Sequence, residues 1–131
     1  MKILIIEDNP EYKCMGILEE CKSMEIEVVV KKARNPGLRE IVCSGNKYDG
    51  IILDMGLPIY EGGRDIGERV GDEILAELRR KKYNIPVLIF SETESKYKSR
   101  CDFVFDQMTT WNVLQEEEKF YKFLLKLEEE N

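Results

Sequence analysis

The sequence contains no histidine, and its four cysteines form no CxxC pair. A zinc site built from the usual cysteine and histidine ligands is therefore not expected. Without histidine the chain can neither donate a phosphoryl group from a phosphohistidine nor use a Ser-His or Cys-His nucleophile pair. Cys14 and Cys21 lie seven residues apart on one face of a predicted helix, which favours reduced thiols in the protein core.

Long apolar runs and long basic runs are also missing. No apolar stretch approaches the ~20 residues that span a bilayer, and charged residues follow the first apolar run too soon for a signal peptide. The formal net charge of −6 and the lack of a lysine or arginine block argue against direct nucleic-acid binding. We therefore expect a cytoplasmic protein without membrane insertion. Its 131 residues, 43% of them hydrophobic, fit one domain, 1–131.

Short branched apolar runs alternate with helical patterns along the chain. The predicted strands cover residues 2–6, 25–30, 50–53, 86–90 and 103–105. The predicted helices cover residues 10–23, 35–45, 71–82 and 112–129, with Asn9-Pro10 and Asn35-Pro36 as the start signals of the first two. This alternation predicts an α/β fold, a flavodoxin-like doubly wound parallel sheet of five strands in the order 2-1-3-4-5.

Acidic residues stand at the ends of the first and third predicted strands. Glu7 and Asp8 follow KILII, and Asp54 follows GIIL. In the order 2-1-3-4-5 these strands are neighbours, so the three carboxylates meet at the edge where open α/β sheets bind ligands. Such a cluster repels itself unless a hard cation neutralises it. The simplest prediction is a Mg²⁺ site.

The motifs KILIIEDN, YDGIILDMGLP and IPVLIFS occur in the order found in response-regulator receiver domains of two-component signalling, the CheY-like family. The sequence resembles that family over about residues 2–91. By this resemblance Asp54 is the phosphoacceptor, and Glu7 and Asp8 hold Mg²⁺ together with it. The resemblance also makes the backbone carbonyl of Gly56 a metal ligand, and it places Ser91 at the family's Ser/Thr switch position, where a hydroxyl can bond a phosphoryl oxygen.

The chemistry of these residues agrees with the resemblance. A carboxylate can accept a phosphoryl group when a divalent cation offsets the crowding of negative charge. Each residue also has an ordinary interpretation. Asp8 could cap the following helix, Glu7 could be an exposed acid, and Gly56 could be only a turn glycine. Ser91 could cap a turn, since serine is common at strand ends.

The sequence departs from the family at the fifth strand. Receivers usually carry a lysine at the end of that strand, where it pairs with the phosphoryl group. Here the segment reads DFVFDQM, and the aligned residue is Asp106. At ~6 Å and an effective dielectric near 20, each unit-charge term is roughly 2 to 3 kcal/mol, so a repulsion would replace an attraction of that size. Lys96 and Lys98 stand in a different context, although either could reach inward from a loop.

Two connections also differ in length from the family. Eleven residues separate Ser91 from Phe103, too few for an average helix with two connections, so the family's fourth helix is expected to be shortened. The connection 57–70, LPIYEGGRDIGERV, is longer than the ~2 to 6 residues typical between a strand and a helix. It starts beside the predicted site, where Arg64 is either a phosphoryl contact or a surface residue.

The favoured function is a stand-alone, atypical receiver that accepts a phosphoryl group on Asp54 with Mg²⁺. Its donor would be a sensor histidine kinase or a phosphotransfer protein, and it would signal to an unknown downstream protein through contacts. Autophosphorylation and autodephosphorylation are the most enzyme activity this implies. The alternative is a degenerate receiver that docks proteins without phosphorylation. Asp106 and the shortened helix favour the alternative, whereas the intact acidic triad favours the first.

Other enzymes on the same fold fit less well. A flavin or dinucleotide binder needs a phosphate loop rich in glycine, serine or threonine after the first strand, where EDNPEYK would repel phosphates. A metal-dependent phosphohydrolase with a DxD nucleophile motif needs an acid at Gly56.

Overall fold

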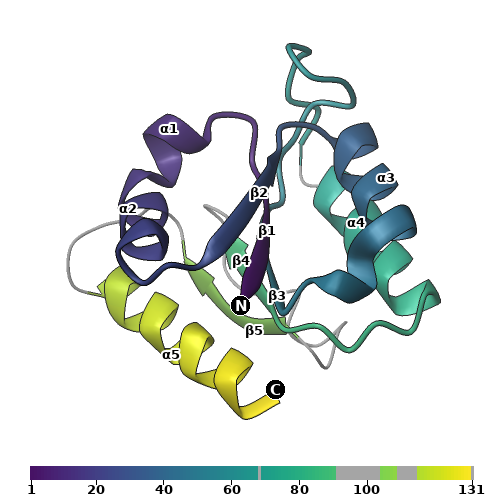
Figure 1. Ribbon diagram of the computed structural model, residues 1–131. Helices are drawn as coiled ribbons and strands as arrows, with labels where there is room; N and C mark the ends of the chain where they lie inside the picture. Colours follow the sequence, from purple (N-terminus) through teal and green to yellow (C-terminus); the bar gives the residue numbers. More distant parts are fainter. Residues whose placement is uncertain (68, 91–103, 109–114, 131) are drawn as a thin grey trace.

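The computed structural model describes residues 1–67, 69–90, 104–108 and 115–130, which form a sheet with helices on both faces (Figure 1). The strands are β1 (Lys2–Ile6), β2 (Glu27–Lys31), β3 (Gly50–Asp54), β4 (Val87–Phe90) and β5 (Val104–Met108). The helices are α1 (Pro10–Lys13), α2 (Met15–Ser23), α3 (Arg34–Ser44), α4 (Arg69–Arg80) and α5 (Gln115–Glu130), with a short 3-10 helix, η1 (Gly45–Lys47).

All paired strands are parallel, in the order β2-β1-β3-β4-β5. This arrangement confirms the predicted α/β class with its parallel sheet and the order of the first four strands. The fifth strand, placed at 103–105 from the sequence, is described as Val104–Met108 beside β4. None of the described helices is long and apolar enough to cross a membrane.

Successive side chains of β1 pack into two different cores. Leu4 and Ile6 pack in a core that includes residues of α3 and α4, whereas Ile3 and Ile5 pack in a core that includes residues of α2 and α5. Figure 1 shows the same layers, with α3 and α4 on one face of the sheet and α1, α2 and α5 on the other. Burial on both faces explains the continuous apolar run, because every position of such a strand excludes water.

The first predicted helix is divided in two. The backbone turns at Cys14, where φ is −115° and ψ is 19°, and α2 begins at the next residue. The Cys14 amide still donates to the Pro10 carbonyl at 2.9 Å. The Cys14 side chain is buried against the sheet, so core packing outweighs helix propensity at this residue. Cys14 and Cys21 are both buried and form no disulfide, in agreement with their predicted place in the core.

The start of α3 differs from the prediction. Ala33, in an extended conformation, precedes the helix, so Asn35 is not its cap and lies in the first turn. The amides of Arg34 and Asn35 donate to the backbone carbonyls of Pro58 and Ile59 at 2.9 and 3.0 Å. Carbonyls from the distant connection after β3 thus satisfy helix amides that a side-chain cap would otherwise serve.

That connection spans residues 55–68 and confirms the predicted long insertion between a strand and a helix. In Figure 1 it rises as a teal loop above the carboxyl ends of the strands. Its arms are held by a hydrogen bond from the Ile66 amide to the Leu57 carbonyl at 3.4 Å. Gly62 and Gly67 adopt positive φ angles of 82° and 96°, a conformation that glycine adopts without strain.

Several predicted features lie outside the described residues. These are the shortened fourth helix of the family, Ser91, Lys96, Lys98, Cys101, Phe103 and Val113. On α5, the predicted apolar residues Phe120, Leu124 and Leu127 are buried.

Gly71 lets α4 approach the end of β3. Its amide donates to the Met55 carbonyl at 2.9 Å, and a Cβ at Gly71 would lie 2.6 Å from the Met55 Cα. Met55 directly follows Asp54, so this close approach supports the backbone that carries the acidic site.

We therefore expect Gly71→Ala to lower the free energy of unfolding by about 1 to 3 kcal/mol, because the added methyl group overpacks against backbone. Gly37→Ala is the matched control. The three atoms nearest to its Cβ would be Ile6 side-chain carbons, at 3.1, 3.1 and 3.5 Å, and alanine favours a helix over glycine by ~1 kcal/mol. Urea unfolding of both proteins measures the difference. Equal stability of the two variants would contradict this account of the α4 contact.

Candidate metal and phosphoacceptor site

The structure brings the three predicted carboxylates together. Ile6 at the end of β1 pairs with Leu53 of β3, so the residues that follow each strand emerge side by side. One oxygen from each of Glu7, Asp8 and Asp54 lies within 4.8 Å of the others. Oxygens at this spacing suit a hard divalent cation. The cluster could therefore hold a metal ion.

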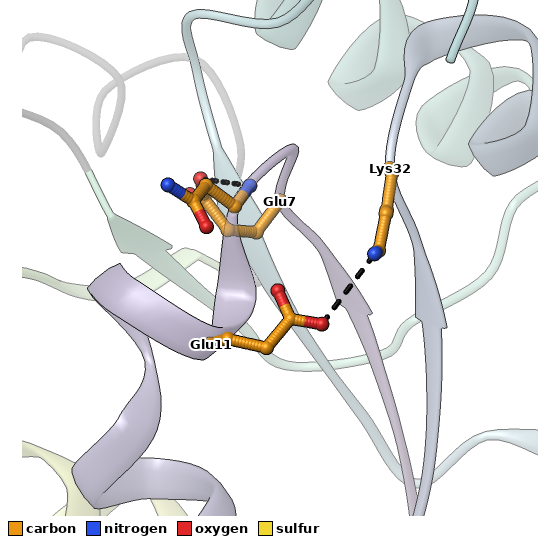
Figure 2. Close-up of polar contacts among 4 residues, drawn as sticks. Glu7, Glu11 and Lys32 are labelled. Atoms are coloured by element: carbon orange, nitrogen blue, oxygen red, sulfur yellow. Dashed lines mark hydrogen bonds and ion pairs between the residues drawn. The ribbon is translucent and has the colours of Figure 1, made fainter. Parts of the chain in front are cut away.

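The cluster is largely shielded from water. Glu7 is 1% exposed and Asp54 is 8% exposed, whereas Asp8 is half-buried. The pKa of Glu7 is raised to about 9, most of all by burial, and also by hydrogen bonds with Asp8 and Asp54 and by the charge of Asp54. The Asn9 amide, which donates to Glu7 Oε1 at 3.1 Å, acts in the opposite direction (Figure 2). In the absence of a cation, the protein therefore favours a proton on Glu7.

Gly56 orients the predicted phosphoacceptor. Its amide donates to Asp54 Oδ1 at 3.1 Å, a bond between residues two apart that closes the turn after β3. This contact places the Gly56 backbone beside the acidic cluster. The role of its carbonyl as a metal ligand stays a prediction.

A salt bridge links α1 to the residue that follows β2. Figure 2 shows Glu11 of α1 and Lys32, which follows β2, pointing toward each other near Glu7. Their Nζ and Oε1 atoms are 3.4 Å apart, and the Glu11 side chain is 70% exposed. An exposed pair of this kind contributes little to stability.

The insertion adds a fourth acidic residue near the site. Asp65 lies against Gly56, and a Cβ built on Gly56 would be 3.0 Å from Asp65 Oδ2. No sequence signal indicated this contact, because the path of the loop is set by its tertiary contacts. Arg64, beside it in the chain, is exposed, and its proposed phosphoryl contact stays a prediction.

The register of β5 differs from the expected alignment. Asp54 of β3 pairs with Phe90 of β4, and Phe90 pairs with Met108 of β5, so these three residues stand at one level of the sheet. Asp106 instead pairs with Leu88, two residues earlier, which is roughly 7 Å from that level. The described register therefore does not place Asp106 at the level of Asp54, and an irregularity between Val87 and Leu88 accounts for one of the two residues of offset. The strand itself, VFDQM, contains no lysine.

No protein-family model matches this sequence, and no curated protein matches it. Solved structures do match. The response regulator TrrA of Thermotoga maritima, in complex with Mg²⁺ and beryllofluoride, is 23% identical, with 93% of this chain and 97% of that chain covered and a TM-score of 0.63. A Francisella response-regulator receiver domain is 20% identical, with 99% and 98% covered and a TM-score of 0.69.

A third match is the receiver domain of a sensor histidine kinase from Pseudomonas aeruginosa, with a magnesium ion coordinated in its active site cleft. It is 17% identical, with 96% of each chain covered and a TM-score of 0.65. The chain has the fold of response-regulator receiver domains. This receiver fold extends over nearly the whole sequence, so the fold expected from the motifs of residues 2–91 also includes the C-terminal part.

The raised pKa of Glu7 gives a test of the cluster in metal-free protein. Protonated Glu7 contributes stability that is fully present below pH 4.5, the ordinary value, and is lost as the pH rises toward about 9. Glutamine cannot ionise, so Glu7→Gln should raise the melting temperature more at pH 8 than at pH 5. Thermal unfolding with a chelator present measures both differences. Glu61→Gln, at an exposed position of the insertion, is the control, and an equal effect of Glu7→Gln at both pH values would refute the assignment.

Proposed function

We propose that this chain is a phosphoacceptor receiver, in which Asp54 accepts a phosphoryl group from the phosphohistidine of a sensor histidine kinase or a phosphotransfer protein. The observation that carries the proposal is the convergence of Glu7, Asp8 and Asp54 at the carboxyl edge of a receiver fold. The Mg²⁺ and beryllofluoride bound by related receivers support it.

The acidic residues fit Mg²⁺. Glu7, Asp8 and Asp54 would hold the ion with the Gly56 carbonyl, a set of hard oxygen donors that leaves room for water and phosphoryl oxygens. Burial, and then the contacts with Asp8 and Asp54, raise the pKa of Glu7, so an ionised Glu7 is unfavourable here without a cation. When bound, Mg²⁺ supplies the positive charge that lets a carboxylate approach an anionic phosphoryl group.

The chain itself contributes the nucleophile and its orientation. An Asp54 carboxylate oxygen attacks phosphorus, an oxygen–phosphorus bond forms, and the phosphorus–nitrogen bond of the donor phosphohistidine breaks. The electron pair of the broken bond stays on the imidazole, which takes a proton. The Gly56 amide holds Asp54 Oδ1 at 3.1 Å and so limits rotation of the carboxylate before the attack. Ser91, the proposed phosphoryl contact, lies outside the described residues.

We further propose that residues 1–131 form a single receiver domain that works in the cytoplasm and signals to a downstream protein by contact. It is atypical because β5 carries no lysine and because the connection 55–68 contacts the start of α3. That connection is the segment of the described chain best placed to respond to a change at Asp54.

A second function is a degenerate receiver that docks proteins without phosphorylation. The composition of β5 favours it, since VFDQM offers no ammonium group to pair with phosphate. The intact carboxylate cluster favours the first function, because a module that only docks has no need for an unfavourable group of buried acids.

Incubation with acetyl phosphate and Mg²⁺ is expected to add one phosphoryl group to Asp54, seen by intact-protein mass spectrometry. Asp54→Asn should show no such mass. Asp8→Asn should require a higher Mg²⁺ concentration for the same yield, because it removes one negative charge from the proposed metal site. An Asp54→Asn protein that is phosphorylated as fully as the original would exclude Asp54 as the acceptor.

Hydrogen exchange separates the phosphorylated switch from the docking module. With Mg²⁺ and beryllofluoride, amide protection should change in residues 57–67 and at Arg34 and Asn35, whose amides bond to the loop. Asp54→Asn, treated in the same way, is the control. Binding of the mimic with unchanged exchange in every segment would favour the docking module.

A further inference from the structure

The space beside Gly56 is occupied by a carboxylate from the insertion. A Cβ built on Gly56 would lie 3.0 Å from Asp65 Oδ2 and 3.3 Å from Asp65 Oδ1. The place that a side chain at position 56 would take is therefore filled by Asp65. A DxD motif that begins at Asp54 has its second acid at position 56, where this sequence has glycine. The fold instead brings the Asp65 carboxylate to the place that this acid would take.

Asp65 is held close to the predicted phosphoacceptor. The Gly56 amide donates to Asp54 Oδ1 at 3.1 Å, and bond geometry within Gly56 then keeps Asp65 Oδ2 within about 9 Å of that oxygen. An attacking water stands roughly 3 Å from phosphorus. A base bonded to that water lies roughly 3 Å further away. An upper limit of about 9 Å is compatible with a phosphoryl group and one water between Asp54 and Asp65.

The Asp65 carboxylate is oriented and accessible to water. Its Oδ1 accepts a hydrogen bond from the Gly67 amide at 2.7 Å, and Gly67 adopts a φ of 96° that suits this turn. Its Oδ2 is the oxygen nearer to Gly56. The residue is exposed, so solvent water reaches it.

We infer that Asp65 is the base that positions water for hydrolysis of phosphorylated Asp54, which makes this receiver release its phosphoryl group by itself. The inference rests on the proposed function. In the step, the water oxygen bonds to phosphorus and the bond from phosphorus to the Asp54 oxygen breaks, with its electron pair returning to the Asp54 carboxylate. Asp65 accepts the proton that the water loses and passes it to solvent. The products are inorganic phosphate and unmodified Asp54.

The lifetime of phosphorylated Asp54 tests the inference. Protein loaded with acetyl phosphate is freed of donor, and loss of the phosphoryl group is followed by mass spectrometry at saturating Mg²⁺. Asp65→Asn keeps an oxygen for the Gly67 amide and removes the base. It should prolong the lifetime at least about tenfold, since a positioned base contributes roughly 10²- to 10⁴-fold. Glu61→Gln makes the same charge change in the same loop and should leave the lifetime as it was.

A complementary pair of variants separates chemistry from loop structure. Asp65→Gly opens the space beside Gly56, whose φ lies in the ordinary range, so a side chain is tolerated there. Adding Gly56→Asp to Asp65→Gly should return the short lifetime, whereas adding Gly56→Asn should not. A structural role of the loop would be unaffected by this exchange, so rescue by the acid alone supports the inference.

The two proposals fail in different ways. If the unaltered protein gains no phosphoryl group on Asp54, the proposed function itself is wrong. If Asp54 is phosphorylated but Asp65→Asn and the original protein lose the group at the same rate at saturating Mg²⁺, Asp65 has no role in hydrolysis.

Discussion

Repulsion among three carboxylates at the ends of β1 and β3 is the constraint on which the site depends. At 4.8 Å and an effective dielectric near 20, each pair of unit charges repels by roughly 3 kcal/mol. The parallel pairing of β1 and β3 forces this approach, because the strands end at the same level. The protein can relieve it by keeping a proton on Glu7 or by binding a cation. A divalent ion is the more effective solution, since it also attracts an anionic substrate.

The connection after β3 ties this site to one face of the sheet. Its carbonyls complete the first turn of α3, and Arg34 in that turn forms a salt bridge with Glu73 of α4 at 2.6 Å. The same connection carries Asp65 to Gly56. The segment that borders Asp54 is hydrogen-bonded to α3 through Pro58 and Ile59, and to α4 through the Met55 carbonyl and the Gly71 amide. A change at Asp54 has a short physical route to α3 and α4, and that route uses no residue of β5.

The errors of the sequence interpretation have a common origin. Asn35-Pro36 is a typical local signal for a helix start. The first amides of α3 nevertheless donate hydrogen bonds to backbone carbonyls more than twenty residues away. The first helix has an unbroken apolar stripe, yet Cys14 turns the backbone as it enters the core. The sequence motif aligns Asp106 with the family's lysine, yet the pairing of β4 and β5 places it two residues before the level of Asp54. In each case a contact between distant segments outweighed a correct local preference.

The sequence by itself determined the sheet, its order over the first four strands and the acidic cluster. Those features follow from short-range patterns, since a branched apolar run is a buried strand and the residue after it stands at the sheet edge. Only the tertiary structure decided the helix-capping role of the insertion, the level of Asp106 and the contact of Asp65 with Gly56. A loop has no periodic pattern that fixes its path. Its course depends on which distant backbone groups and cavities it meets when the chain packs.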